Sequence, residues 1–186
     1  MMIYILTGVA KSGKSLVAQE IMKRYQISII QTDHIMMMLN RGNPKLSIDI
    51  DASDSTVSYQ IEPYIKALID TLIENKKSVL FEGVHFLTRF ARDLIRQYPH
   101  QIKIIYLVYE HMDHDTKAKE LLEHASKMEN PWFLSYDKNA YQKLIQYLVS
   151  ESKRIADECR INQIPYLEVT DIIKQTDEII DCLFNE

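Results

Sequence analysis

A short segment near the start of the chain has the residue types and spacing that bind the phosphates of a nucleoside triphosphate. It follows an apolar run, and it reads glycine, four residues, glycine, lysine and serine. The segment comprises Gly8, Val9, Ala10, Lys11, Ser12, Gly13, Lys14 and Ser15. Its glycines let backbone N–H groups approach phosphate oxygens. Lys14 can reach the β- and γ-phosphates, and the Ser15 hydroxyl is suited to ligate Mg²⁺.

The residues after this segment predict a helix that supports the same function. Apolar residues recur with helical spacing at Val17, Ala18, Ile21, Met22 and Tyr25. A helix that begins near Lys14 directs the positive end of its dipole at a bound anion. The alternative, a glycine-containing turn without a ligand, is disfavoured because the chain has only four glycines and two of them stand here.

Acidic residues follow two of the predicted strands and could act on a substrate or a metal. Asp33 comes after residues 27–31, where its carboxylate could accept a proton from an attacking hydroxyl or could cap the following helix. Glu82 closes residues 78–82 and could order Mg²⁺ or bind a substrate hydroxyl, or it could be an ordinary polar strand end. His85 could contact substrate or be structural.

Cationic side chains bear on how an acceptor and a triphosphate would be held. Arg41, Arg89 and Arg92 follow the second and third predicted strands and could bind an anionic acceptor, although they could equally be exposed surface residues. The chain has no arginine between Arg96 and Arg154. Charge from that stretch must come from Lys117, Lys119, Lys127, Lys138 or His124, and lysine lacks the bidentate geometry of arginine.

Composition is that of an ordinary globular protein. The 186 residues are 46% hydrophobic and 26% charged, with a formal net charge of −4, which argues against nucleic acid as the main partner. Cys159 and Cys182 lack metal-type spacing and are expected to be reduced thiols in the cytoplasm. We expect neither a signal peptide nor a membrane span.

The elements that must position these residues alternate between strands and helices. Strands are predicted at residues 3–7, 27–31, 78–82, 102–109 and 165–170. Helical periodicity between them indicates an α/β fold, with a parallel sheet covered on both faces. Pro63 is expected in the first turn of the helix that precedes residues 78–82. We expect residues 1–186 to be one domain with irregular excursions at about 41–59 and 126–139.

Together these motifs resemble the small P-loop kinases of the adenylate-kinase-like group. The nearest resemblance is to 2-phosphoglycerate kinase-like and zeta-toxin-like proteins. It rests on Gln31-Thr32-Asp33-His34-Ile35 and on Phe81-Glu82-Gly83-Val84-His85.

The resemblance implies further assignments. It implies a three-layer P-loop NTPase fold with sheet order 2-3-1-4-5, and Asp33 as the base. It implies that the first excursion helps form the acceptor site, that the second is the lid, and that Thr170 borders the adenine. Lids of this group usually carry arginines, whereas His124 stands here where an arginine is expected.

Two functions are consistent with the sequence. The first is a kinase that moves the γ-phosphate of ATP to a hydroxyl of a small molecule. The second is a nucleotide-binding module, or degenerate kinase, that senses a nucleotide and reports to a protein partner. A GTPase is disfavoured because no Asn-Lys-x-Asp guanine motif is present. The oligomeric state stays open, since apolar helix faces suit both a core and a dimer.

Overall fold

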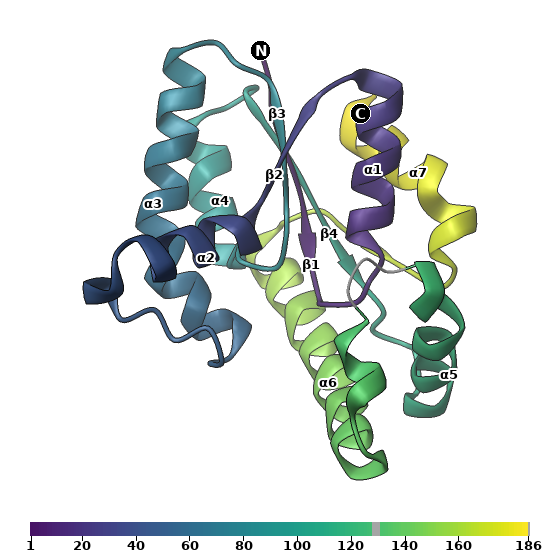
Figure 1. The fold of residues 1–186 in the computed structure, drawn as a ribbon. Coiled ribbons are helices and arrows are strands. Elements are labelled where there is room, and N and C mark those ends of the chain that lie inside the picture. The colour runs from purple at the N-terminus through teal and green to yellow at the C-terminus, as the bar shows by residue number, and fades with distance from the viewer. Residues whose placement is uncertain (128–130, 186) are drawn as a thin grey trace.

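Five parallel strands form one central sheet in the computed structural model, which describes residues 1–127 and 131–185 (Figure 1). The strand order is β2-β3-β1-β4-β5. The strands are β1 (Ile3–Gly8), β2 (Ser28–Gln31), β3 (Val79–Glu82), β4 (Ile102–Val108) and β5 (Tyr166–Glu168). All five predicted strands are present, and the sheet order confirms the expected P-loop fold.

Helices cover both faces of the sheet, so the fold has three layers. In Figure 1, α1 and α7 lie on one side of the strands, and α3 and α4 lie on the other. The helices are α1 (Lys14–Tyr25), α2 (Thr32–Gly42), α3 (Asp54–Glu74), α4 (Thr88–Gln97), α5 (His114–His124), α6 (Lys138–Asn162) and α7 (Ile172–Phe184). None of them, within the described ranges, has both the length and the hydropathy of a membrane span.

Alternating side chains of the central strand β1 supply the two halves of the core. Ile3 and Ile5 pack on the face covered by α3 and α4, and Leu6 packs on the face covered by α1 and α7. Because paired residues of parallel strands point to the same face, Thr7 lies on the same face as its partner Tyr106. This arrangement brings the carboxyl ends of β1, β2 and β3 to one edge of the sheet.

The helix after the first excursion begins earlier than the sequence predicts. α3 starts at Asp54, where the Ser53 hydroxyl accepts a hydrogen bond from the Thr56 backbone N–H at 3.3 Å. Pro63 consequently lies inside the helix, and its expected place in the first turn is wrong. Proline removes one helical hydrogen bond, and the buried apolar stripe of the helix offsets that loss. The stripe consists of Val57, Ile61, Ile65 and Ile69.

The two excursions are shorter than expected, because helices extend into both of them. Residues 43–53 join α2 to α3 and include a 3-10 turn at Pro44–Leu46. The second excursion contains 3-10 turns at Ala125–Lys127 and Trp132–Ser135, and residues 128–130 lie outside the described part of the chain. Asp137 then caps α6 through the Ala140 N–H at 2.8 Å.

Candidate active site

The loop between β1 and α1 surrounds the ammonium group of Lys14. The Lys14 Nζ donates hydrogen bonds to the Val9 carbonyl at 2.6 Å and to the Gly8 carbonyl at 3.3 Å, and contacts the Ser12 Oγ at 3.3 Å. Burial lowers the pKa of Lys14 to about 8, even though nearby carboxylates oppose this effect. The Lys14 ammonium is therefore poorly solvated, and its hydrogen bonds go to neutral oxygens. A phosphate could replace these oxygens as its partner.

Gly13 fixes the junction between the loop and α1. Its φ of +86° lies in the left-handed region, and a Cβ here would come within 2.4 Å of the Ile172 side chain. The glycine is thus required by its backbone conformation and by packing against α7, in addition to the approach of phosphate predicted from the motif. The first N–H groups of α1 follow directly, as in helix N-termini that bind anions.

Two further lysines link the loop to other parts of the chain, one from within the loop and one from α5. The ammonium of Lys11 lies 5.0 Å from the centre of the Trp132 ring, so the second excursion touches the loop. Lys117 is buried, donates to the Lys11 carbonyl at 2.8 Å and lies 3.9 Å from the centre of the Tyr109 ring. Burial lowers the pKa of Lys117, and its ion pair with Glu120 opposes that shift. Lys117 thus holds the loop through its hydrogen bond to the Lys11 carbonyl.

Ser15 and Glu82 form a pair of oxygen ligands beside the loop. The Ser15 hydroxyl donates to the Glu82 carboxylate at 3.3 Å. Glu82 is only 6% exposed, and burial raises its pKa while the charge of Lys14 lowers it. A hydroxyl and a buried carboxylate are hard oxygen donors of the kind that Mg²⁺ prefers. The residues present therefore fit a magnesium ion.

Asp33 lies next to His85, at the start of α2. Asp33 is in the first turn of α2 but does not cap it, because the N-cap position is Gln31. The His85 Nδ1 is 3.6 Å from the Asp33 Oδ1 and 2.8 Å from the Thr32 hydroxyl. Burial is the main cause of a lowered pKa for His85, so the ring is neutral near pH 7. A neutral imidazole here can orient the Asp33 carboxylate.

Gly83 makes room for this arrangement. Its φ is +149°, and a Cβ here would lie 1.8 Å from the Thr32 hydroxyl oxygen. The tight approach places the start of α2 against the turn after β3. Thr32 thereby reaches His85, 53 positions later in the chain.

Sequence reasoning missed Asp54, the first residue of α3. It lines the same cleft as Lys14 and Asp33, and burial raises its pKa while Lys14 opposes the rise. The helix-start pattern at Ser53 and Asp54 could have drawn attention to it. That pattern predicts a helix end but contains no information about which cleft the helix end faces.

These residues share one open cleft with a volume of about 610 Å³. The residues predicted from the sequence that line it are Ala10, Lys11, Ser12, Gly13, Lys14, Ser15, Asp33, Glu82 and His85. Such a volume is within the range of small-molecule sites. The cleft lies at the carboxyl ends of the strands, where open α/β sheets bind ligands.

Solved structures with the same architecture are small P-loop kinases. Shikimate kinase from Acinetobacter baumannii in complex with shikimate has a TM-score of 0.58 at 14% identity, over 100% of this chain and 94% of that chain. Shikimate kinase from Bacteroides thetaiotaomicron has a TM-score of 0.57 at 11% identity, over 100% and 99%. Dephospho-CoA kinase from Campylobacter jejuni has a TM-score of 0.52 at 12% identity, over 96% and 95%.

The chain has the fold of P-loop kinases. No protein-family model matches its sequence, and no curated protein matches it. The likeness is therefore one of architecture, and the chemistry must be argued from the residues in the cleft.

Several predicted site residues do not line the cleft of this P-loop fold. Arg89 forms a two-pronged ion pair with Glu62 at 3.0 and 2.6 Å. Arg92 pairs with Asp93 and donates to Asn162 at 3.0 Å. Arg41 is exposed near the end of α2, and the Thr170 backbone N–H donates to Gln175 at 2.8 Å. Gly8 and Val9 of the loop do not line the cleft either.

The cations expected in the second excursion are dispersed in the P-loop fold. Lys119 is exposed and lies 3.8 Å from Glu123, and the His124 Nδ1 lies 3.8 Å from Glu120. Lys138 is exposed at the start of α6. None of these side chains, nor the buried Lys117, lines the cleft as the structure describes it.

Proposed function

We propose that this chain is an ATP-dependent phosphotransferase that moves the γ-phosphate to a hydroxyl group of a small molecule. The observation that carries the proposal is the cleft itself, which Lys14, Ser15, Glu82 and Asp33 all line. A cation for the phosphates, oxygen ligands for a metal and a carboxylate base thus face a common volume. Two of the kinases with this fold are shikimate kinases, which supports a small hydroxyl-bearing acceptor.

The proposed transfer assigns one task to each side chain. Lys14 leaves the loop carbonyls and binds the β- and γ-phosphates. Ser15 and Glu82 would hold Mg²⁺, which neutralises charge on the phosphates when bound. Asp33 accepts the proton of the acceptor hydroxyl. The hydroxyl oxygen then bonds to the γ-phosphorus as the bond from that phosphorus to the β–γ bridging oxygen breaks, and ADP leaves with the electron pair.

Neighbouring segments complete the proposed site. We assign residues 43–53 to the acceptor site and the second excursion to a lid, within a single kinase-like domain of residues 1–186. Thr170 is assigned to the border of the adenine. The contact of Lys11 with Trp132 supports the lid assignment. The subgroup resemblance to 2-phosphoglycerate kinase-like and zeta-toxin-like proteins, and a place in the cytoplasm, belong to this proposal. The buried free thiol of Cys159 supports the latter.

Substitution of Lys14 tests the nucleotide assignment. We expect Lys14→Ala to weaken MgATP binding roughly 100-fold in calorimetry, because a charge-assisted contact to phosphate is lost. Lys153→Ala, which removes an exposed lysine of α6, is the control and should bind as the parent does. Equal affinity of Lys14→Ala and the parent would refute the assignment.

Substitution of Asp33 tests the base. Asp33→Asn should lower kcat by roughly 10²-fold or more, with MgATP affinity retained. Asp115→Asn is a matched control, because Asp115 is also exposed in the first turn of a helix, α5. Unchanged phosphotransfer by Asp33→Asn means that another group takes the proton.

The second candidate is a nucleotide sensor that reports to a protein partner. The absence of arginine from the second excursion favours it, since lysine and histidine would have to supply the lid charge. A screen for acceptor-dependent ADP formation separates the two. Stimulation by a small hydroxyl compound favours the kinase, and MgATP binding without any stimulation favours the sensor.

A further inference from the structure

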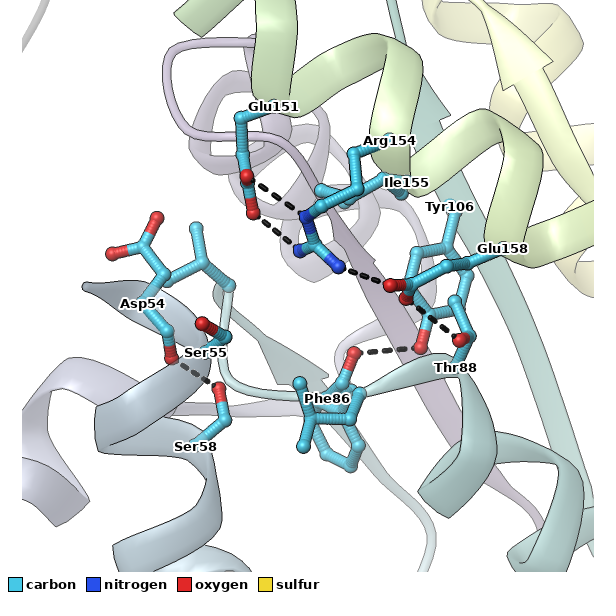
Figure 2. Close-up of a pocket in the computed structure, with 13 residues that line it drawn as sticks. Asp54, Ser55, Ser58, Phe86, Thr88, Tyr106, Glu151, Arg154, Ile155 and Glu158 are labelled. Atoms are coloured by element: carbon cyan, nitrogen blue, oxygen red, sulfur yellow. Dashed lines mark hydrogen bonds and ion pairs between the residues drawn. The ribbon is translucent and has the colours of Figure 1, made fainter. Parts of the chain in front are cut away.

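A small side cavity adjoins the cleft on the face of the sheet that carries α3 and α6 (Figure 2). Asp54 and Val84 line both hollows, so the side cavity lies directly beside the candidate active site. Its volume is about 20 Å³. A volume of that size accommodates one group about as large as a water molecule, which is also the size of an ammonium group.

The lining of the side cavity carries more negative than positive charge. Its carboxylates belong to Asp54, Glu151 and Glu158, and its cation is Arg154. Figure 2 shows the Arg154 guanidinium between Glu151 and Glu158, bonded to both. The second oxygen of Glu158 accepts a hydrogen bond from Thr88 at 3.0 Å. Arg154 is therefore matched within the protein and offers no free guanidinium edge to an anion.

Asp54 is the carboxylate of this lining that has no counter-charge in contact with it among the described residues. Its side chain accepts a hydrogen bond from the Tyr147 hydroxyl at 3.5 Å. The remaining influences on it are burial and the more distant charges of Lys14, Glu151 and Asp33, and burial is the largest cause of its raised pKa. A partly buried carboxylate without a cation in contact with it is energetically unfavourable, and a cationic ligand would relieve it.

A buried hydroxyl on the same sheet face also lacks a partner. The Thr7 Oγ1 is fully buried and is the one such side-chain atom without a hydrogen bond among the described residues. Thr7 is adjacent to Gly8 and in register with Tyr106, and both of these residues line the side cavity. Buried hydroxyls nearly always have partners, so this one shows that the protein leaves a polar group unsatisfied next to residues that line the side cavity, although Thr7 itself does not line it.

Two arginines outside the side cavity are also paired with groups of the protein. Arg89 is held by both oxygens of Glu62 and stacks on the Tyr59 ring at 4.6 Å, and Arg92 is held by Asp93 and Asn162. An acceptor whose phosphate or carboxylate was bound by Arg89 or Arg92 would thus have to displace an existing partner of that arginine. Repulsion from Asp54 and Asp33 would add to that cost.

We propose that the acceptor is an amino alcohol whose primary ammonium group occupies the side cavity against Asp54, while its hydroxyl faces Asp33. This inference rests on the proposed phosphotransferase function. It names the substrate class by charge: a cation at one end and a reactive hydroxyl at the other. The body of the acceptor lies along the part of the cleft lined by Met36, Ile50, Ala52 and Val57.

Matched acceptors that differ only in charge test the proposal. One set is glucosamine, N-acetylglucosamine and glucuronate, and a shorter set is ethanolamine, N-acetylethanolamine and glycolate. Acceptor-dependent ADP formation by the full chain with MgATP gives kcat/KM for each compound. We expect the amine to exceed its neutral and anionic counterparts by about tenfold or more in at least one set, because pairing with the partly buried Asp54 carboxylate is lost without it. Equal rates, or preference for the anion, would overturn the proposal.

Substitution of Asp54 assigns the preference to a residue. Asp54→Asn should raise KM for the amine about tenfold and bring amine and neutral acceptor within about threefold of each other. Asp115→Asn is the control, because Asp115 is exposed in the first turn of another helix, α5, and lines neither hollow. A preference retained in Asp54→Asn overturns the proposal.

A measurement on the parent protein covers the case in which the variant does not fold. Ethylammonium chloride should inhibit competitively against the amine acceptor, whereas potassium chloride at the same concentration should not. Equal inhibition by both salts would assign the side cavity to a bare cation and overturn the proposal.

The outcomes also distinguish a failure of this inference from a failure of the proposed phosphotransferase function. If the parent fails to bind MgATP, the proposed function fails. If it binds MgATP and phosphorylates only neutral or anionic acceptors, or none of the compounds, the amino-alcohol inference alone is overturned.

Discussion

The two halves of the cleft hold their cations in opposite ways. In the phosphate half, Lys14 is bonded to loop carbonyls and Lys11 lies over an aromatic ring. On the acceptor side, Arg154 in the adjoining side cavity is held between Glu151 and Glu158, and Arg89, outside the cleft, is held by Glu62. A carbonyl or a ring leaves the full positive charge available to a ligand, whereas a carboxylate neutralises it. The first arrangement prepares a site for an anion, and the second uses its cations to hold the protein together.

Gly13→Ala should have the largest effect on stability, because it strains the junction between the phosphate-binding loop and α1. A side chain at a φ of +86°, with Cβ only 2.4 Å from Ile172, should cost about 2 to 4 kcal/mol of unfolding free energy. Denaturant titration measures it. Gly42→Ala, where nothing lies within 4 Å of the added Cβ, should leave stability nearly unchanged. Similar losses in both variants would show that the overlap with Ile172 is unimportant.

Arg154→Met should have the next largest effect and would show that acceptor-half cations are structural. It leaves Glu151 and Glu158 without their shared partner, which should cost about 2 kcal/mol. The Arg154 side chain is 40% exposed, so solvent screening keeps the loss below that of a fully buried pair. Lys153→Met, at the exposed neighbouring position, should change stability by less than about 0.5 kcal/mol. No loss in Arg154→Met would mean that the ion pairs are fully solvated.

Raising the pH should weaken the phosphate half specifically. With the pKa of Lys14 lowered to about 8, the free protein loses the ammonium proton as pH rises from 7 to 9. Because phosphate binds the protonated form, MgATP affinity should fall roughly tenfold at pH 9. Calorimetry at the two pH values measures the change, and Lys14→Ala should show a much flatter profile. An affinity constant up to pH 9 would indicate an ordinary lysine.

Lowering the pH should produce the smallest effect, through His85 in the acceptor half. Its pKa is lowered by burial, so the folded protein binds this proton less tightly than the unfolded chain. Stability contributed by the neutral ring is fully present above the unfolded pKa near 6.5 and is lost as pH falls through the lower folded value. Unfolding free energy should therefore decrease with falling pH, and less steeply in His85→Gln. Identical slopes would place the effect elsewhere.

The sequence predicted the position of the loop and of its flanking elements, because this information is local, and the binding of phosphate there stays a prediction. One contiguous segment contains the loop, and the strands and first helix follow from short periodic runs. The acceptor half depends on pairings between distant positions, such as Arg89 with Glu62, 27 positions apart, or Thr32 with His85. No sequence motif predicts these pairings, so whether an arginine is free or ion-paired was not predictable.

Boundary errors have the same origin. The start of α3 at Asp54 depends on the Ser53 cap and on an apolar stripe that buries against the sheet, and this packing outweighs the interruption by Pro63. Local propensity favours a helix that starts at the proline. Asp54 therefore lies in the site because tertiary packing, and not local propensity, sets the start of α3.

The contact between Lys11 and Trp132 gives the protein an optical reporter of its own. Trp132 is the only tryptophan in the sequence, and its ring faces the cleft 5.0 Å from a loop cation. Indole emission depends on nearby charge and water. A phosphate that draws Lys11 away from the ring should change the fluorescence of the unlabelled chain, so that loop occupancy can be followed in real time without any acceptor.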